Sequence, residues 1–321
     1  MKRLGCLVAA IAALLIAGAL AVSLLFGSAS VEEETSFVIP SGSSLTAIAE
    51  KLEDEGLISS ADGFVLRARL LGGSTPIQAG EFQLEPGMSQ TDMLRAFQQG
   101  DVIRRFVTIP EGMPSILVHE RLMAEDLLTG EVAVPAEGSV LPDTYDFERG
   151  ESRQAVLDRM QAAMAAYLAE AWEKRRPDIA VSTPREALIL ASVVEKETGV
   201  PSERRMVAGL YSNRLKIGMR LQADPTIIYP ITKGKPLGRR IRRSEIDAIN
   251  DYNTYSMAGL PKGPITNPGR ESIAAVLDPE RTSAIYMVAD GSGGHAFADT
   301  YAEHEANVAK WRQIRRARGE I

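Results

Sequence analysis

The sequence predicts an α+β fold in three parts: an N-terminal transmembrane helix, a small β/α module and a mixed α/β domain. Three observations support this. Residues 4–26 carry no charged side chain, a strand-turn-helix pattern occurs three times between residues 37 and 122, and helical periodicity dominates from residue 151. We place the boundaries at 1–30 for the cytoplasmic tip, anchor and tether, 31–104 for the module and 105–318 for the larger domain.

The uncharged apolar segment is long enough to cross a membrane. At ~1.5 Å per residue, a helix over 4–26 spans a hydrocarbon core of ~30 Å, whereas the apolar part of a cleaved signal peptide covers only about 7 to 15 residues. Lys2 and Arg3 precede it and three glutamates at 32–34 follow it, which keeps the N-terminus in the cytoplasm. We therefore expect a single-pass protein of the inner membrane, in contact with the lipid bilayer, with its larger domain on the extracytoplasmic side. The small residues at 28–30 leave signal-peptide cleavage as the alternative.

Composition excludes several classes of function. The net charge of -6 gives no general attraction to nucleic acid. The only cysteine, Cys6, lies inside the apolar segment, so the exported part forms no internal disulfide. The three histidines show no metal-ligand spacing, and no phosphate-loop or dinucleotide fingerprint is present, so we expect neither a metal nor a cofactor.

The strand-turn-helix pattern defines the small module. Each copy has an alternating strand, a Pro/Gly turn and a helix with apolar residues four apart, and the copies begin at Phe37, Phe82 and Val107. Their uneven spacing excludes a solenoid. The apolar helix positions are Ile48 and Leu52, Met93 and Phe97, and Val118 and Leu122. The first copy, over 42–52, resembles the LysM module that binds cell-wall glycans; a β/α module that binds nothing is the alternative.

Two helices are expected next. Residues 151–176 show a helical apolar stripe that includes Val156, Met160 and Met164, which we assign to the core. A second helix begins after Thr183, its N-cap, with Pro184 first and Glu186 closing a capping box, and it runs to about Thr198 before Gly199.

Glu197 lies in the middle of the apolar face of this second helix, whereas Glu195 falls on its polar side with Ser192 and Lys196. Desolvation of a carboxyl group raises its pKa toward the range that a general acid needs. Glu197 is therefore the candidate catalytic acid, and we expect Glu195 to be solvated. The alternative is that Glu197 points into solvent or pairs with Arg204 or Arg205.

The motifs around this helix resemble those of the endolytic murein transglycosylases. In order along the chain they are EG at 137–138, LPDTY at 141–145, ASVVEKETGVP at 191–201, NRL at 213–215, GMRLQ at 218–222, DPT at 224–226, YNTY at 252–255, GLP at 259–261, GPITNPG at 263–269 and VADGSGGH at 288–295. Two positions depart from the family pattern, Ala223 where Thr is usual and Pro230 where Gly is common. These departures concern the shape of a loop rather than the proposed acid.

The resemblance implies a reaction and a set of partners. The glutamate followed by Thr, Glu197, is implied as the acid/base that cleaves the bond between N-acetylmuramic acid and N-acetylglucosamine and leaves a 1,6-anhydro end. Cleavage of nascent peptidoglycan strands would set their length, with peptidoglycan synthases as partners. Polar residues of the matched motifs are candidates for contacting substrate: Gln222, Asp224, Tyr252, Asn253 and His295.

Two other functions remain open at this point. A cell-wall-binding scaffold would use the LysM-like module alone and would not need an acid on an apolar helix face. A hydrolytic muramidase would use Asp224 as a second carboxylate and would leave reducing ends. The basic run at 233–243 suits attraction of wall carboxylates or, alternatively, a solvated surface.

Overall fold

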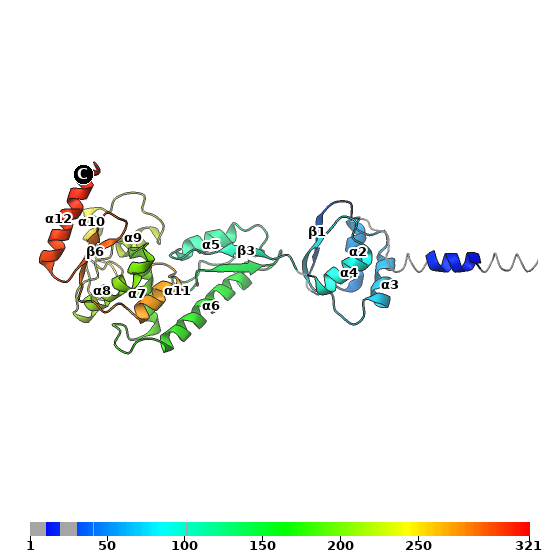
Figure 1. The fold of residues 1–321 in the computed structure, drawn as a ribbon, viewed down its shortest axis with the longest axis horizontal. Helices are drawn as coiled ribbons and strands as arrows, with labels where there is room; N and C mark the ends of the chain where they lie inside the picture. The colour runs from blue at the N-terminus through cyan, green and yellow to red at the C-terminus, as the bar shows by residue number, and fades with distance from the viewer. Residues whose placement is uncertain (1–10, 20–30, 41, 101) are drawn as a thin grey trace, which may run out of the picture. The chain divides into compact units, whose positions relative to one another are not determined.

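The computed structural model describes residues 11–19, 31–40, 42–100 and 102–321, which form two compact units. Unit 1 contains the described residues up to Arg105 together with Asp146–Gly150, and unit 2 contains Phe106–Tyr145 and Glu151–Ile321 (Figure 1). The chain crosses the boundary in β3 (Arg105–Thr108) and returns in β4 (Thr144–Phe147), and these two strands form one sheet. The predicted α+β class is confirmed as a mixed fold of helices and small two-stranded sheets.

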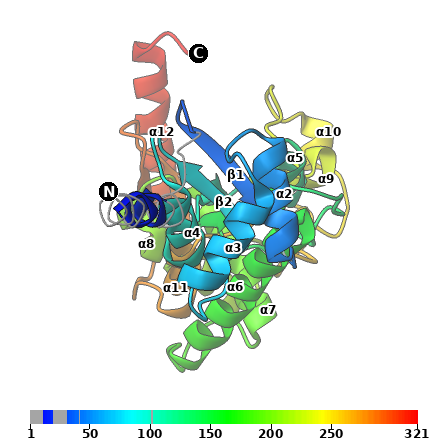
Figure 2. The ribbon, with the colours of Figure 1, turned by 90° about the vertical axis from the view of Figure 1, so that its right-hand side faces the viewer.

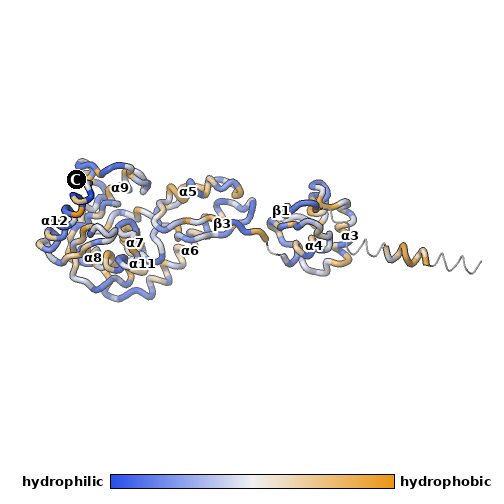
Figure 3. Tube along the Cα trace, turned by 45° about the horizontal axis from the view of Figure 1, so that its top comes forward, coloured by the Kyte–Doolittle hydropathy of each residue, from blue (hydrophilic) through white to orange (hydrophobic). Residues whose placement is uncertain are grey.

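The predicted membrane segment at 4–26 lies largely outside the described residues. Of that segment, residues 11–19 are described and helical, and they are hydrophobic throughout most of their length (Figure 3). Within the described ranges, no helix has the length and apolar character needed to cross a membrane.

Unit 1 consists of β1 (Thr35–Ile39), α2 (Leu45–Asp54), α3 (Ala61–Leu71), β2 (Gly80–Leu84) and α4 (Gln90–Gln99). Ser44, Ser60 and Ser89 begin the three helices, each accepting a hydrogen bond from a backbone N–H of the first turn. The strands β1 and β2 pair antiparallel, with Phe37 opposite Phe82. The unit thus places its short sheet beside three capped helices.

The predicted repeat is confirmed in all three copies. The first two copies are β1 with α2 and β2 with α4, and the third is β3 with α5 (Ser115–Met123). All six apolar helix positions of the repeat are buried. In unit 1 the ring of Phe97 lies 5.6 Å from that of Phe37 and 5.2 Å from that of Phe82, so equivalent positions of two copies meet in one core.

Unit 2 is mainly helical, with one small sheet near its C-terminal end. Its further elements are α6 (Arg153–Glu173), α7 (Pro184–Glu197), η1 (Pro201–Glu203), α8 (Arg204–Lys216), α9 (Pro225–Thr232), α10 (Arg243–Ile246), α11 (Arg270–Leu277), β5 (Tyr286–Ala289), β6 (His295–Ala298) and α12 (Tyr301–Ala317). Strands β5 and β6 pair antiparallel, and α12 packs against both. Helix α12, red in Figure 2, stands at the edge of the unit.

Helix α7 is the central helix of unit 2 and contacts α6, α8, α9 and α11. Its residues Leu190, Ala191 and Val194 are completely buried. Its predicted start is confirmed, since the Thr183 hydroxyl accepts from the Glu186 N–H at 3.1 Å. The capping box differs in one detail: the Glu186 carboxylate accepts from the Ser182 N–H at 2.7 Å. Because α7 ends at Glu197, its fixed core position determines where that side chain lies.

Candidate active site

A cavity of about 470 Å³ lies at the C-terminal end of α7. Residues from α7, α8, the segment before α9, the loop between α10 and α11, β5, β6 and α12 line it. They are Glu197, Tyr211, Arg214, Gln222, Asp224, Tyr255, Tyr286, Met287, Val288, Ala289, His295, Tyr301 and His304. This size, with several polar groups converging on one space, is typical of a small-molecule site.

Glu197 contributes to this cavity a carboxyl group whose pKa is raised. Burial raises its pKa from 4.5 to about 7, the charge of Asp224 adds to the rise, and Tyr211 and Arg214 oppose it. The hydroxyl of Tyr211 is completely buried and has no hydrogen-bond partner in the described part of the chain. A carboxyl group with a pKa near 7 can donate a proton and take it back at neutral pH.

Arg214 supports the floor of the cavity. Its Nε donates to the carbonyl of Ile285 at 2.6 Å, and its Nη1 donates to the carbonyl of Leu221. Burial lowers the pKa of this guanidinium, while the charges of Tyr211 and Glu197 raise it. Arg214 therefore ties α8 to two cavity walls, the start of β5 and the segment that holds Gln222.

Gln222 and Asp224 are held by the YNTY motif. Gln222 has a φ of 52°, a left-handed conformation that side-chain-bearing residues rarely adopt, and its N–H donates to the carbonyl of Thr254 at 3.2 Å. The hydroxyl of Tyr255 donates to Asp224 Oδ1 at 2.6 Å. Strained backbone at such a position, fixed by neighbouring groups, is common at functional sites.

His295 is oriented by Glu203. One carboxylate oxygen of Glu203 accepts from the His295 backbone N–H at 2.8 Å, and the other lies 2.8 Å from its ring Nδ1. The second oxygen also accepts from the hydroxyl of Thr198, the residue after Glu197, at 3.2 Å. A carboxylate at Nδ1 places the proton there and leaves Nε2 as the ring atom available to a ligand. At Gly294, a Cβ would lie 2.4 Å from Glu203 Oε1, so a larger residue here would displace the carboxylate that holds His295.

The structure brings together four of the six predicted site residues: Glu197, Gln222, Asp224 and His295. Tyr252 and Asn253 lie elsewhere. Asn253 is completely buried and its amide donates to the backbone carbonyls of Ile246 and Ala248 at 2.9 and 2.6 Å. The Tyr252 ring packs on Tyr229 with 4.9 Å between centroids.

Several residues that line the cavity were not predicted from the sequence. Tyr255 is the tyrosine of the YNTY motif that lines the cavity, and no local pattern distinguishes it from Tyr252. Arg214 lies in a matched motif, NRL, but nothing local marks it as a cavity residue. Tyr211 shares the cavity with it from one helical turn earlier, a spacing that could have indicated a common face.

The prediction that Glu195 is solvated is wrong. Only 6% of its side chain is exposed, its Oε2 accepts from the Gly269 N–H at 3.0 Å, and Arg204 lies 4.0 Å from its Oε1. Ser192 is likewise buried and accepts from the Ile265 N–H at 3.0 Å. The loop at 265–269 therefore covers the polar side of α7.

The alternative pairing of Glu197 with arginine is also absent from the described residues. Arg204 pairs with Glu111 at 2.9 Å, and Arg205 pairs with Asp278 at 2.8 Å. The carboxyl group of Glu197 thus lines the cavity without Arg204 or Arg205 as a partner, and burial raises its pKa.

Comparison with known proteins gives consistent results. The YceG-like family profile matches residues 37–310. A Bacillus subtilis (strain 168) protein named endolytic murein transglycosylase is 29% identical over 309 residues, which cover 86% of this chain and 84% of that protein. A protein of the same name from Streptococcus pneumoniae D39 is 28% identical over 321 residues, and the alignment covers 85% of this chain but only 57% of the pneumococcal protein.

A solved structure of a yceG-like protein from Listeria monocytogenes has a similar fold. The TM-score is 0.54 at 26% sequence identity, and the match covers 85% of this chain and 98% of that one. The family match extends through both units and includes every residue of the cavity. The chain therefore belongs to the YceG-like family.

Proposed function

We propose that this protein is a lytic transglycosylase that cleaves peptidoglycan strands endolytically, with Glu197 as its catalytic acid and base. The observation that carries the proposal is one carboxyl group with a pKa of about 7 at the wall of a polar and aromatic cavity. Relatives named endolytic murein transglycosylase support the substrate class.

The reaction follows from a single acid. Glu197 protonates the oxygen that links C1 of N-acetylmuramic acid to N-acetylglucosamine, and that C1–O bond breaks. The C6 hydroxyl of the same muramic acid attacks C1 and closes a 1,6-anhydro ring, while its proton passes to the Glu197 carboxylate. The acid is restored, and no water is consumed. A pKa near neutrality serves both proton transfers.

The other polar groups of the cavity stabilise the oxocarbenium-like transition state and position the sugar. Asp224 is fixed by the hydroxyl of Tyr255 at 2.6 Å, and its negative charge suits a developing positive charge at C1. Gln222 and His295 supply hydrogen-bonding groups from two other walls. We assign no substrate contact to Tyr252 or Asn253, which do not line the cavity.

A hydrolytic muramidase is the second candidate, because Asp224 lies in the same cavity as Glu197. The two functions differ in their products. The full-length protein in detergent is incubated with purified peptidoglycan, and the released muropeptides are analysed by mass spectrometry, with Glu197→Gln in parallel. Anhydro ends from the wild type alone support the transglycosylase; reducing ends support the hydrolase and direct attention to Asp224. Intact glycan that is bound but not cut would support the scaffold.

We further propose that residues 4–26 anchor the protein in the inner membrane, that 31–104 form a LysM-like module which binds glycan, and that 105–318 form the catalytic domain. The uncharged segment supports the anchor, and the β1-α2-α3-β2 order with antiparallel strands supports the module. A cavity of about 380 Å³ in unit 1 lies between the segments after β1 and after α3 and offers space for a sugar. Setting of strand length and association with wall synthases rest on the family resemblance alone.

A further inference from the structure

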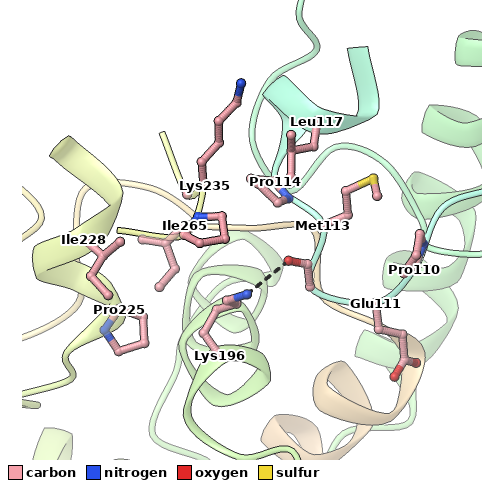
Figure 4. A pocket seen from close by; sticks show the side chains of 13 residues that line it. Pro110, Glu111, Met113, Pro114, Leu117, Lys196, Pro225, Ile228, Lys235 and Ile265 are labelled. Carbon is pink, nitrogen blue, oxygen red and sulfur yellow. Dashed lines mark hydrogen bonds between the residues drawn. The ribbon is translucent and has the colours of Figure 1, made fainter. Parts of the chain in front are cut away.

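A second cavity of unit 2, of about 450 Å³, is mainly apolar. It lies between the loop before α5, the end of α7, the start of α9 and the loop after α9 (Figure 4). We call it the α7–α9 groove and define it by Met113, Pro114, Leu117, Pro225, Ile228 and Ile265, together with Lys196. The catalytic mechanism uses none of these side chains.

The groove adjoins the catalytic cavity through two pairs of consecutive residues. Lys196 lines the groove and Glu197 the catalytic cavity; Pro225 lines the groove and Asp224 the catalytic cavity. The two cavities thus share the end of α7 and the start of α9. A substituent of a sugar bound at Glu197 could therefore enter the groove only past these two chain segments, which places the groove next to the reacting sugar.

Lys196 gives the groove a positive charge without a counter-ion. Its Nζ donates to the Gly112 carbonyl at 3.4 Å, the dashed line in Figure 4, and no described carboxylate lies within ion-pair distance of it. The other charges at the rim are neutralised: Lys235 pairs with Glu120, and Glu111 with Arg204. In Figure 4 the carboxylate of Glu111 and the ammonium of Lys235 both point away from the apolar side chains.

A ligand that fits this groove has small apolar groups and at least one carboxylate. Proline and isoleucine side chains offer contacts to methyl groups, and the Lys196 ammonium offers a charge-assisted hydrogen bond. An acidic, alanine-containing peptide attached to the reacting muramic acid has this chemistry. In a stem-bearing strand the lactyl carboxyl of the muramic acid is held in the amide bond to the peptide, so a carboxylate that can pair with Lys196 has to come from the stem.

We propose that the α7–α9 groove binds the peptide stem of the wall polymer, with Lys196 pairing with a stem carboxylate. This inference rests on the proposed function, since it places the substituent of the sugar that Glu197 processes. It makes the stem a determinant of which glycan bonds are cut.

The test compares two substrates for full-length protein in detergent: glycan strands that carry stems, and the same strands stripped of peptide by an amidase. We expect the wild type to favour stem-bearing strands in kcat/KM by about tenfold, the value of one charge-assisted hydrogen bond. Lys196→Gln and Ile228→Glu should each reduce this preference to near unity, and Lys196→Arg should restore it. Lys310→Gln, an exposed lysine of α12, should keep the wild-type ratio.

Three results would overturn the inference. One is a wild type with no preference for stems, and another is Lys196→Gln with an unchanged ratio. The third is an equal loss on both substrates together with a lower melting temperature, which would make Lys196 structural. If the wild type cuts neither substrate, the proposed function fails, but the groove can still be tested by titrating the protein with the free stem peptide that the amidase releases. Binding of the peptide that Lys196→Gln weakens would support the groove assignment. No binding of the peptide would refute it.

Discussion

Replacement of Glu197 by glutamine should abolish activity and, at alkaline pH, make the protein more stable. Burial raises the pKa of the folded-state carboxyl from 4.5 to about 7. Between these values the folded protein holds a proton that the unfolded chain has lost, so stability falls as pH rises and levels off above pH 7. The full shift corresponds to about 3 kcal/mol against the folded state at pH 8 and about 1 kcal/mol at pH 5.

Glutamine has nearly the same shape and no charge, so it removes this penalty. We expect Glu197→Gln to unfold at a higher temperature than the wild type at pH 8, by several degrees at roughly 2–4 °C per kcal/mol for a domain of this size. The gain at pH 5 should be about a third as large. Thermal unfolding followed by circular dichroism at both pH values measures it, alongside anhydro-muropeptide release.

The control is Glu173→Gln, which removes an exposed glutamate from α6 and should leave both melting temperatures close to wild type. If Glu197→Gln gave no more stability at pH 8 than at pH 5, the carboxyl would not be held at a raised pKa by burial. Its candidacy as an acid at neutral pH would then lose its physical basis.

Three other substitutions test the surroundings of this acid. Asp224→Asn removes a charge that raises the pKa of Glu197, so the alkaline limb of the kcat/KM profile should move to lower pH; an unmoved limb would argue against that coupling. Glu203→Ala removes the acceptor of both bonds from His295 and of the bond from Thr198, so we expect kcat/KM to fall about tenfold and the free energy of unfolding to fall by about 1–3 kcal/mol; full activity in a steady-state assay would show that the orientation of His295 is unimportant. Glu81→Gln, in unit 1, weakens hydrogen bonds that outweigh burial and lower the pKa of that carboxyl, so urea unfolding should show a loss of about 1–3 kcal/mol; an unchanged midpoint would contradict it.

The sequence predicted those features that depend on neighbouring residues. The three strand-turn-helix copies and the start of α7 were found because their apolar spacing and caps lie within about ten residues of each other. Helix α3 has no counterpart in the repeat and was missed, although it buries Phe64 and Ala68. Its capping serine, Ser60, is the local signal that was available.

The placement of polar groups depended on segments distant in the chain. A helical wheel separates the two sides of α7 but cannot show that the loop at 265–269 covers the polar side and satisfies Ser192 and Glu195. The same limit applies to the YNTY motif, where Asn253 bonds to carbonyls and Tyr255 reaches Asp224. The chemical type of a side chain was enough to name it as a candidate for the site. Only the tertiary contacts distinguished the residues that line the cavity from those that hold the lining residues in place.

Three consecutive residues at the end of α7 show how one helix terminus supports different roles. Glu195 anchors the loop at Gly269, Lys196 lines the α7–α9 groove and Glu197 enters the catalytic cavity. The carboxyl-terminal end of a helix carries a partial negative charge from its unsatisfied carbonyls, which favours a cation such as Lys196 and disfavours ionisation of Glu197. Glu195 tolerates the same field because it accepts a backbone hydrogen bond and lies near Arg204. Placing the acid at the last helical residue therefore adds to burial in keeping Glu197 protonated near neutral pH, whereas the same residue in the first turn of a helix would be driven toward its charged form.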